Sequence, residues 1–427
     1  MYDLKFIRSH EALVREAIAR KRESADLDRI LELDRRRRER LGEVEAMKSE
    51  RNRRSQEIGR AKAAGREVDG EAAAVRALGD RIQALDEELR GIDAAVEDLL
   101  QWVPNIPDES VPIGDESANQ VVRAWGEPRR EEGLRDHLEL GAALGILDIS
   151  ASARMSGSGF SVHLGAGARL QRALIDFMLD FHCARGFREV RVPYLTRAEA
   201  LFGCGQLPKL HEDMYALPAE ELFLIPTAEV PLTNLHRGTT LFEKDLPIRL
   251  VAYSPCFRRE AGAHGKQTHG LVRLHQFDKV EMVKLVLPET GADELESLTA
   301  AAEGVLQALG LPYRVVLLAT GDLSFAAAKC YDLELWAPGE GRWLEVSSCS
   351  HFTDFQARRI GLRYRAADGK LRHLHTLNGS GVALPRLTVA LLEHYQTPQG
   401  TVRLPEALAP YMGGLRELAP PAGGAEG

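Results

Sequence analysis

Two stretches of alternating residues, 248–260 and 273–285, carry side chains that suit nucleotide binding. The alternation predicts two antiparallel strands. Because successive side chains of a strand point to opposite faces, Arg258 and Glu260 should share one face of the first strand. The corresponding face of the second strand should hold His275, Phe277, Lys279 and Glu281.

Such a surface could bind a nucleotide, because adenine can stack on an aromatic ring while a guanidinium group binds a phosphate. The residues between the two strands, 261–272, are rich in glycine and histidine and predict a long, flexible, cationic loop. An exposed sheet face held by salt bridges would explain the same residue types. Both interpretations stay open on residue types alone.

A further predicted strand, within residues 341–359, holds candidates for a cation site. Here Glu345 and Ser347 alternate with the apolar Leu344 and Val346. A carboxylate beside serine hydroxyls suits Mg²⁺, which takes a few protein oxygens together with phosphate oxygens. The signal is weak by itself, since the polar edge of a strand has the same composition.

A glycine-rich turn is expected at 379–381, directly before a helix that starts at about Pro385. Arg386 would then stand near the start of that helix, where the backbone N–H groups favour an anion. A single glycine-rich turn before a helix has low specificity. The motif therefore gains meaning only beside the other two.

The first 105 residues predict a different element, an antiparallel helical hairpin. Its arms run from about 27 to 62 and from about 71 to 100, with a polar connection that contains Gly65 and Gly70. Each arm should be roughly 45 to 50 Å long, at about 1.5 Å per residue. A heptad seam along the second arm comprises Val75, Leu78, Ile82, Leu85, Leu89, Ile92, Val96 and Leu99.

The first arm is basic outside its packing stripe. Acidic residues interleave with the basic ones, which favours a solvated coiled-coil face with ion pairs along the helix. The alternative is a row of cations that neutralises the phosphates of a nucleic acid. The candidate nucleic-acid contacts are Arg35, Arg38, Lys48, Arg51, Arg53 and Arg54.

Proline and glycine divide the chain. Three prolines between 104 and 112 are incompatible with a helix interior and predict a linker. The last residues are rich in glycine, proline and alanine, which predicts a flexible tail. The expected division is an N-terminal domain at 1–105 with the hairpin at about 27–100, a linker at 106–117, a second domain at 118–412 and the tail at 413–427.

Composition excludes several protein classes. With 427 residues, 44% hydrophobic and 28% charged, the chain is not wholly disordered. No apolar run reaches the roughly 18 residues that a membrane span needs. Five scattered cysteines without CxxC spacing argue against a disulfide scaffold or a zinc finger and suit a reducing cytoplasm. The net charge of -8 argues against a general nucleic-acid coat but allows a local basic surface.

Together these features resemble the class II aminoacyl-tRNA synthetases and, in detail, the bacterial-type seryl-tRNA synthetase family, across almost the whole chain. FRREAG with HQFDKVE resembles the second class motif, and GSGVALPR resembles the third. FHCARGFREVRVPYL, with Pro193, resembles the first. Blocks similar to serine-specific members are PNIPDESVP, DHLELGAALGILD, GQLPK, PTAEVPLTN, EVSSCS and DFQARR.

The resemblance implies an α+β fold, in which a class II antiparallel sheet flanked by helices follows an N-terminal coiled-coil hairpin. It implies a cytoplasmic ligase that activates L-serine with ATP and Mg²⁺ and transfers serine to tRNA(Ser) and, where present, tRNA(Sec). The hairpin would hold the long variable arm of the tRNA. A homodimer with Pro193 at its interface is expected, with no membrane contact. No zinc is expected, because ordinary members carry the blocks around Cys256 and Cys349 without a metal.

The resemblance also implies catalytic roles for Arg258, Glu260 and Arg386. Arg258 would hold the α-phosphate and the serine carboxylate, Glu260 would meet the adenine amino group, and Arg386 would bind the γ-phosphate. Glu281 would bind the serine hydroxyl. The other implied ATP ligands are Arg259, Phe277, Glu345, Val346, Ser347 and Ser348, with Glu345 and Ser348 also holding Mg²⁺. The serine site would comprise Thr227, Ala228, Glu229, Arg258, Glu281, Thr376, Asn378 and Ser380.

Six positions depart from the family pattern, and none of them replaces a residue assigned above to ATP or serine. Because of these departures, one alternative is a divergent second copy that tolerates a serine-like antimetabolite. An amino acid:carrier-protein ligase is another, but the full hairpin argues against it. An inactive paralogue should have lost one of the catalytic residues, and all are present. The departures are Gly159, Cys204, Cys330, His351, Phe352 and Pro385.

Overall fold

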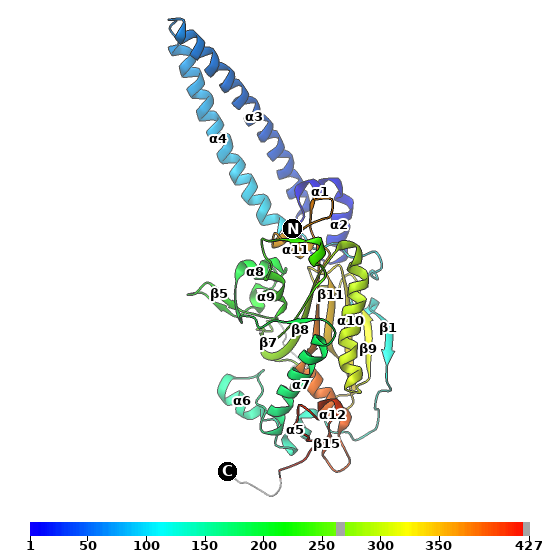
Figure 1. Ribbon diagram of the computed structural model, residues 1–427. Helices are drawn as coiled ribbons and strands as arrows, with labels where there is room; N and C mark the ends of the chain where they lie inside the picture. The colour runs from blue at the N-terminus through cyan, green and yellow to red at the C-terminus, as the bar shows by residue number, and fades with distance from the viewer. Residues whose placement is uncertain (262–269, 422–427) are drawn as a thin grey trace. The chain divides into compact units, whose positions relative to one another are not determined.

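The computed structural model describes residues 1–261 and 270–421 (Figure 1). By its internal contacts the chain divides into two compact units, Met1–Pro104 and Asn105–Gly427. None of the described helices is both long and apolar enough to cross a membrane. The loop predicted between the two nucleotide-binding strands falls largely on 262–269, outside the described residues.

The first unit consists of two short helices and a long helical hairpin. Asp26 caps the first arm by accepting a hydrogen bond from the backbone N–H of Arg29, and the second arm begins at Asp69. The hairpin that the heptad spacing predicted is therefore present. The helices of this unit are α1 (Leu4–Ser9), α2 (Glu11–Arg20), α3 (Leu27–Ala63) and α4 (Asp69–Leu100).

The heptad seam of α4 packs against α3. Val44 of α3 lies in one buried cluster with Ile82, Leu85 and Leu89 of α4, and Met47 packs against it. At the seam's C-terminal end the buried residue is Leu100, because the helix turns this side chain rather than Leu99 toward the core. The seam therefore stabilises the hairpin as predicted, with a shift of one residue at its end.

The second unit is built on an eight-stranded sheet with the order β1-β9-β10-β11-β14-β8-β7-β2. Every neighbouring pair is antiparallel except β2 with β7. In sheet order the strands are β1 (Gln120–Trp125), β9 (Tyr313–Leu317), β10 (Lys329–Ala337), β11 (Arg342–His351), β14 (His375–Ala383), β8 (Gln276–Val286), β7 (Ile248–Phe257) and β2 (Arg188–Glu189).

Helices α7, α10 and α12 cover this sheet. Together with inward-facing residues of the strands, they form the main hydrophobic core. All residues of β8 from Val280 to Val286 are buried, because this central strand is covered on both faces. The helices of the unit are α5 (His137–Ala143), α6 (Ile149–Ser156), α7 (Ala166–Cys183), α8 (Ala198–Gly203), α9 (Glu229–Asn234), α10 (Gly291–Ala308), α11 (Phe355–Arg359) and α12 (Leu384–Tyr395).

The described residues of this unit also form three small sheets. Their strands are β3 (Leu195–Arg197), β5 (Leu222–Leu224) and β4 (Ala216–Leu217); β13 (Leu371–Arg372), β12 (Arg363–Arg365) and β6 (Thr240–Phe242); and β15 (Val402–Arg403) with β16 (Glu417–Leu418). The pairing of β16 with β15 differs from the predicted flexible tail at 413–427, because Leu418 is buried. Residues 422–427 lie outside the described part of the chain.

The proline-rich segment at 106–117 packs on the second unit instead of lying free. The amide of the preceding Asn105 is fully buried and donates to the backbone carbonyls of Ala326 and Phe352. Later in the segment, the backbone carbonyl of Pro112 accepts the backbone N–H of Thr320. Prolines prevent a helix here, as predicted, but the segment's remaining polar groups find partners in the sheet unit.

Candidate active site

The antiparallel pairing of β7 and β8 positions the first group of candidate residues. In this register Ala252 lies opposite Glu281, and Cys256 lies opposite Phe277. Arg258 follows the end of β7, yet its backbone N–H still donates to the backbone carbonyl of His275 at 2.8 Å. Its guanidinium carbon lies 5.2 Å from the centre of the Phe277 ring. The predicted proximity of a guanidinium group and an aromatic ring is therefore present.

Glu260 differs from its predicted place on the strand. β7 ends at Phe257, and Glu260 has a positive φ of 52°, a backbone conformation that is uncommon outside glycine. This turn directs its carboxylate to Arg273, whose Nε lies 2.5 Å from Oε2. The neighbouring Arg259 is exposed and donates its backbone N–H to Asp213. Glu260 therefore pairs with Arg273 in the segment before β8, instead of continuing the face of β7.

A bulge in β11 arranges the candidate cation ligands. The pairing with β10 shifts by one residue at Val346, so that Glu345 pairs with Glu334 and Ser348 pairs with Asp332. Opposed residues share a face, which places Glu345 and Ser348 on the same side. Ser347 instead turns into the core and donates to the carbonyl of Ser380, so the prediction that Glu345 and Ser347 share a face was wrong.

Arg386 lies in the first turn of α12, which begins at Leu384, close to the predicted start. Its Nε donates to the carbonyl of Val272 at 3.0 Å, and its Nη1 donates to the carbonyl of Glu345 at 2.7 Å. The Glu345 carboxylate lies 3.3 Å from the same nitrogen. Arg386 thus joins the segment that precedes β8 to strand β11.

The glycines before α12 form no turn, contrary to prediction, because 379–381 lie within β14. A Cβ on Gly379 would lie 2.9 Å from Cys349 Sγ, and one on Gly381 would lie 2.6 Å from His182 Nε2. Glycine is needed here because neighbouring side chains pack directly against the strand. Pro385 falls in the first turn of α12, where proline fits.

Glu281 is fully buried at the centre of the candidate serine site. Its Oε2 lies 2.5 Å from the ammonium of Lys279 and accepts from the hydroxyl of Thr227 at 3.2 Å. Its Oε1 accepts from the Asn378 amide at 3.1 Å. A buried carboxylate requires such partners to remain charged. Sequence analysis placed Lys279 on this face but gave it no role.

The Asn378 amide oxygen is buried and has no hydrogen-bond partner within the described residues. Ser380 lies opposite Glu281 in the pairing of β14 with β8. Ala228 is fully buried beside Thr227. A buried acceptor without a donor costs free energy, which a bound donor would recover.

Glu229 forms a second buried carboxylate near Glu281. Burial, and then the charge of Glu281, raises the pKa of Glu229 to about 7. Gln356 opposes this shift by donating to Glu229 Oε1 at 2.8 Å, while its own carbonyl accepts from Thr376 at 2.7 Å. Thr376 therefore reaches the site through Gln356. Sequence analysis missed Gln356, and its presence within the quoted block DFQARR was the only available signal.

The departures from the family pattern lie around this site without removing its charged groups. Cys330 contacts Ser348, with 3.1 Å between Sγ and Oγ. His351 Nε2 lies 2.9 Å from His375 Nδ1. Gly159 accepts the backbone N–H of His275, and a Cβ there would lie 2.4 Å from the His275 ring. Cys204 and Phe352 are buried. Glycine at 159 is thus explained by close contact.

Burial raises the pKa of the Cys256 and Cys349 thiols, the latter to about 12. Both thiols are fully buried. The expectation of no zinc stays a prediction.

Most basic candidates on the hairpin are paired with acidic side chains. Among the residues predicted to contact nucleic acid, Arg38 pairs with Asp34 and Lys48 with Asp86. Within the described part of the chain, Arg35 and Arg51 form no ion pair. The remaining pairs join Arg53 with Glu50 and Glu57, and Arg54 with Glu50.

Comparison with known proteins identifies the family of this chain. The seryl-tRNA synthetase N-terminal domain matches residues 1–107, and the tRNA synthetase class II core domain (G, H, P, S and T) matches residues 215–395. The curated serine–tRNA ligase of Syntrophomonas wolfei is 51% identical over 425 residues, which cover 99% of this chain and 100% of that protein. The chain belongs to the seryl-tRNA synthetase family.

Further matches agree with this assignment. The serine–tRNA ligase of Caldanaerobacter subterraneus is 53% identical over 416 residues, covering 96% of this chain and 98% of that protein. The structure of seryl-tRNA synthetase from Pyrococcus horikoshii complexed with ATP has a TM-score of 0.95 and 38% identity, and the match covers 99% of this chain and 100% of that one.

These comparisons confirm three predictions: the family, the class II fold with its N-terminal hairpin, and the enzyme class, a ligase. Near-complete coverage does not favour the alternatives of a divergent second copy or a carrier-protein ligase. The individual site residues stay predictions.

Proposed function

We propose that this enzyme activates L-serine with ATP and transfers the serine to tRNA(Ser). In the first step a serine carboxylate oxygen attacks the α-phosphorus, the bond to the β-phosphate breaks, and seryl-adenylate and pyrophosphate form. In the second step a hydroxyl of the terminal tRNA ribose attacks the seryl carbonyl and AMP leaves. The serine carboxylate is already ionised at pH 7, so catalysis rests on alignment and charge stabilisation.

One observation carries the serine assignment, namely the buried polar group around Glu281. Its carboxylate is held by Lys279, Thr227 and Asn378 and would accept the hydroxyl of serine. The unpartnered Asn378 amide oxygen would accept from the substrate ammonium. Alanine carries the ammonium but lacks the hydroxyl, so it would bring no donor to the Glu281 carboxylate and is therefore rejected. Glu229, with a pKa of about 7, is the second candidate partner of the ammonium.

Arg258, Phe277, Glu260 and Arg386 are the proposed ATP ligands, in the roles that the family resemblance implies. The guanidinium of Arg258 beside the Phe277 ring favours an adenine stacked on that ring with its α-phosphate bound nearby. Glu260 would keep its Oε2 on Arg273 and accept the adenine amino group with its other carboxylate oxygen. Arg386 would keep its Nε on the carbonyl of Val272, while its Nη1 exchanges the carbonyl of Glu345 for the γ-phosphate.

A divalent cation fits the face of β11 that carries Glu345 and Ser348. Asp332, opposite Ser348, adds a third oxygen ligand that sequence analysis missed. Burial, and then the charge of Glu345, raises the pKa of Asp332, and a cation bound beside it would favour its charged form. We propose that Glu345 and Ser348 hold Mg²⁺ with ATP, where it neutralises phosphate charge.

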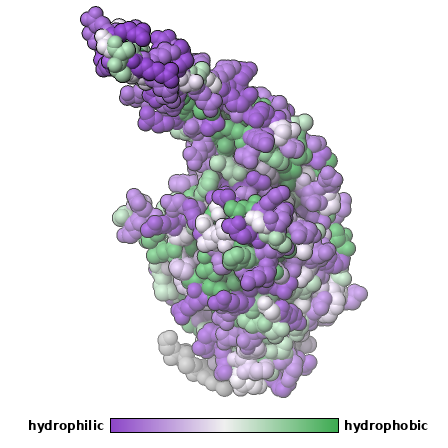
Figure 2. All heavy atoms as spheres, turned by 45° about the horizontal axis from the view of Figure 1, so that its top comes forward, coloured by the Kyte–Doolittle hydropathy of each residue, from purple (hydrophilic) through white to green (hydrophobic). Residues whose placement is uncertain are grey.

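The hairpin is the proposed tRNA-binding element. Figure 2 shows mostly hydrophilic side chains on the visible face of the hairpin, at the top of the view. A hollow in its surface is lined by residues that include Arg53, Arg54, Arg60 and Arg66. Changing Arg51, Arg53 and Arg54 to Glu should weaken tRNA binding and its salt dependence, with serine activation intact. Unchanged aminoacylation of limiting tRNA would contradict this role.

Four further assignments complete the proposal. Residues 1–105 form the tRNA-binding domain and 118–412 the catalytic domain. Two chains form a homodimer, with the exposed Pro193 at the interface. The enzyme acts in the cytoplasm. It also charges tRNA(Sec) where that tRNA exists.

Aminoacylation of purified tRNA(Ser) tests the proposed function directly. We expect attachment of serine in the presence of ATP and Mg²⁺, with threonine, alanine and cysteine as poor competitors. Efficient charging with another amino acid, or none with serine, would contradict the proposal.

A further inference from the structure

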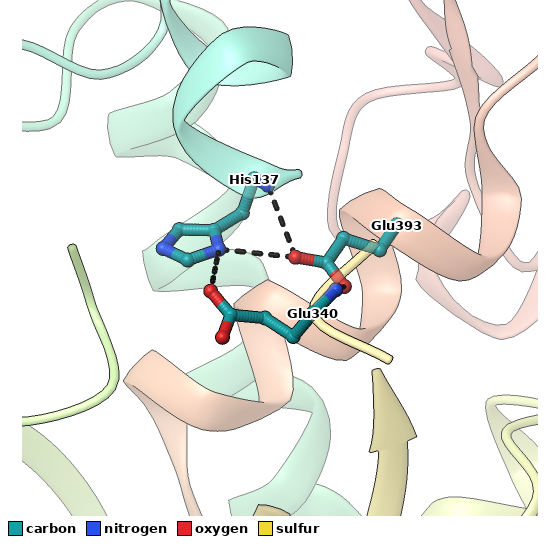
Figure 3. Close-up of side chains that lie close together, drawn as sticks. All are labelled: His137, Glu340 and Glu393. Carbon is teal, nitrogen blue, oxygen red and sulfur yellow. Dashed lines mark hydrogen bonds and ion pairs between the residues drawn. The ribbon is translucent and has the colours of Figure 1, made fainter. Parts of the chain in front are cut away.

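His137, Glu340 and Glu393, none of which was assigned to serine, lie together in the second unit (Figure 3). His137 Nδ1 lies 3.0 Å from Glu393 Oε1 and 3.7 Å from Glu340 Oε1. His137 and Glu393 are both fully buried. Two carboxylates beside a histidine have the composition of a metal site, so the hydrogen bonds must decide between a metal and a structural network.

The hydrogen bonds argue against a metal ion. His137 Nε2 accepts the backbone N–H of Leu271 at 3.2 Å, so the proton of the neutral ring lies on Nδ1, which faces Glu393. A protonated Nδ1 has no lone pair for a metal. The Glu393 carboxylate also accepts the backbone N–H groups of His137, Gly339 and Glu340, which satisfies both of its oxygens.

The network instead fixes the segment that leads into β8. The backbone of Gly270 approaches the His137 ring so closely that a Cβ there would lie 2.2 Å from Nε2. Leu271 is held by His137, and the carbonyl of the next residue, Val272, is held by Arg386. Two successive residues are thus anchored by neighbouring groups.

Both anchors originate on one face of α12. Arg386 and Glu393 are seven residues apart, about two helical turns, and so project from the same side. Arg386 reaches Val272 directly, whereas Glu393 reaches Leu271 through His137. The following residue, Arg273, holds the carboxylate of Glu260. The segment therefore touches proposed ligands of both the phosphates and the adenine.

We propose that His137 and Glu393 are positioning residues for ATP: they hold residues 270–272 against α12 and so place Arg386 and the Arg273–Glu260 pair. This inference rests on the proposed function, because it takes Arg386 and Glu260 as ATP ligands. Within the described residues, neither His137 nor Glu393 forms a hydrogen bond or ion pair with a residue assigned to serine. Their loss should therefore weaken ATP binding much more than serine binding.

Serine-dependent ATP–pyrophosphate exchange with the full-length enzyme tests the inference. In His137→Phe, we expect the KM for ATP to rise roughly threefold to tenfold, the range of one buried hydrogen bond, and the KM for serine to change less than about twofold. His137→Gln, which retains a donor and an acceptor, should recover part of the loss. Tyr395→Phe is the control. Tyr395 also lies in α12, and this change removes the hydrogen bond that its hydroxyl donates to the carbonyl of Leu309.

Gly270→Ala probes the contact from the other side, since its Cβ would displace the segment from His137. It should raise the KM for ATP as well, which keeps the inference testable if His137→Phe does not fold. An unchanged KM for ATP in a folded variant, or equal rises for ATP and serine, would overturn the inference. One tightly bound metal ion per chain at this cluster would also overturn it. Absence of exchange in the unmodified enzyme would instead contradict the proposed function.

Discussion

The hairpin and the eight-stranded sheet carry their charged residues in different ways. On α3, Arg53 pairs with Glu50 and Glu57, which lie three and four residues away on the same exposed helix. In the sheet, Glu281 is fully buried, and its partners include Thr227 and Asn378, which are distant in sequence.

This difference predicts how each region responds to mutation. Exposed ion pairs contribute about 0 to 1 kcal/mol each and are screened by salt, so hairpin charges can be changed at little cost to the fold. A buried charge that loses its partner costs about 3 to 5 kcal/mol. Substitutions in the sheet should therefore have large, specific effects on activation, and those in the hairpin should have small, salt-dependent effects on tRNA.

The largest effect should follow Arg258→Ala. Because Arg258 is proposed to stabilise charge at the α-phosphate, its loss should lower the kcat of serine-dependent pyrophosphate exchange by about 10² to 10³. The affinity for tRNA should not change. Arg130→Ala is the matched control, because Arg130 also lies over an aromatic ring, that of Trp336. Normal exchange by Arg258→Ala would remove this residue from the catalytic site.

Glu281→Gln should affect serine selectively. The amide places N–H donors where the serine hydroxyl needs an acceptor, so the KM for serine should rise by about 100-fold and that for ATP by no more than about threefold. Glu294→Gln is the control, since Glu294 pairs with the buried Lys284 outside the proposed site. Equal rises for serine and ATP would show that Glu281 does not read the side chain.

On the hairpin, unpaired arginines should matter more than paired ones. Arg35→Ala with Arg51→Ala should lower the salt slope of tRNA binding by up to about two, which is about 0.9 per lost phosphate contact. Arg53→Ala with Arg54→Ala should have a smaller effect, because these arginines already bind Glu50. Filter binding between low and moderate salt measures both slopes. Equal slopes would mean that ion pairing does not decide which arginines bind RNA.

The smallest effect should be the pH dependence of serine binding. Burial raises the pKa of Glu229 to about 7, so the carboxylate is largely ionised at pH 8 and largely protonated at pH 6. Only the ionised form attracts the serine ammonium, and the KM for serine should therefore rise severalfold as the pH falls through this range. In Glu229→Gln this dependence should disappear. A persisting dependence would assign the titration to another group.

The two regions also differed in how far sequence predicted them. Heptad spacing depends on neighbours three and four residues away, so the hairpin and its seam were predicted nearly to the residue. The strands at β7 and β8 were predicted by alternation, but Glu260 lies beyond the strand in a turn with positive φ. Alternation also failed at Val346, because a bulge depends on the partner strand.

Contacts between distant segments were the part that sequence could not supply. Gln356 meets Glu229 across 127 residues, and His137 meets Leu271 across 134. Nothing in the local pattern of either residue marks its partner. The family resemblance named the candidate ligands, whereas Lys279, Asp332 and Gln356 acquired roles only through the fold.

The central claim is that a buried carboxylate next to an arginine-bound nucleotide selects serine without help from the hairpin. Pyrophosphate exchange by the full-length enzyme in the absence of tRNA, with serine, threonine and alanine in parallel, tests it most directly. The account predicts rapid exchange with serine and at least about 100-fold slower exchange with alanine. Comparable exchange with alanine, or exchange that requires tRNA, would contradict it.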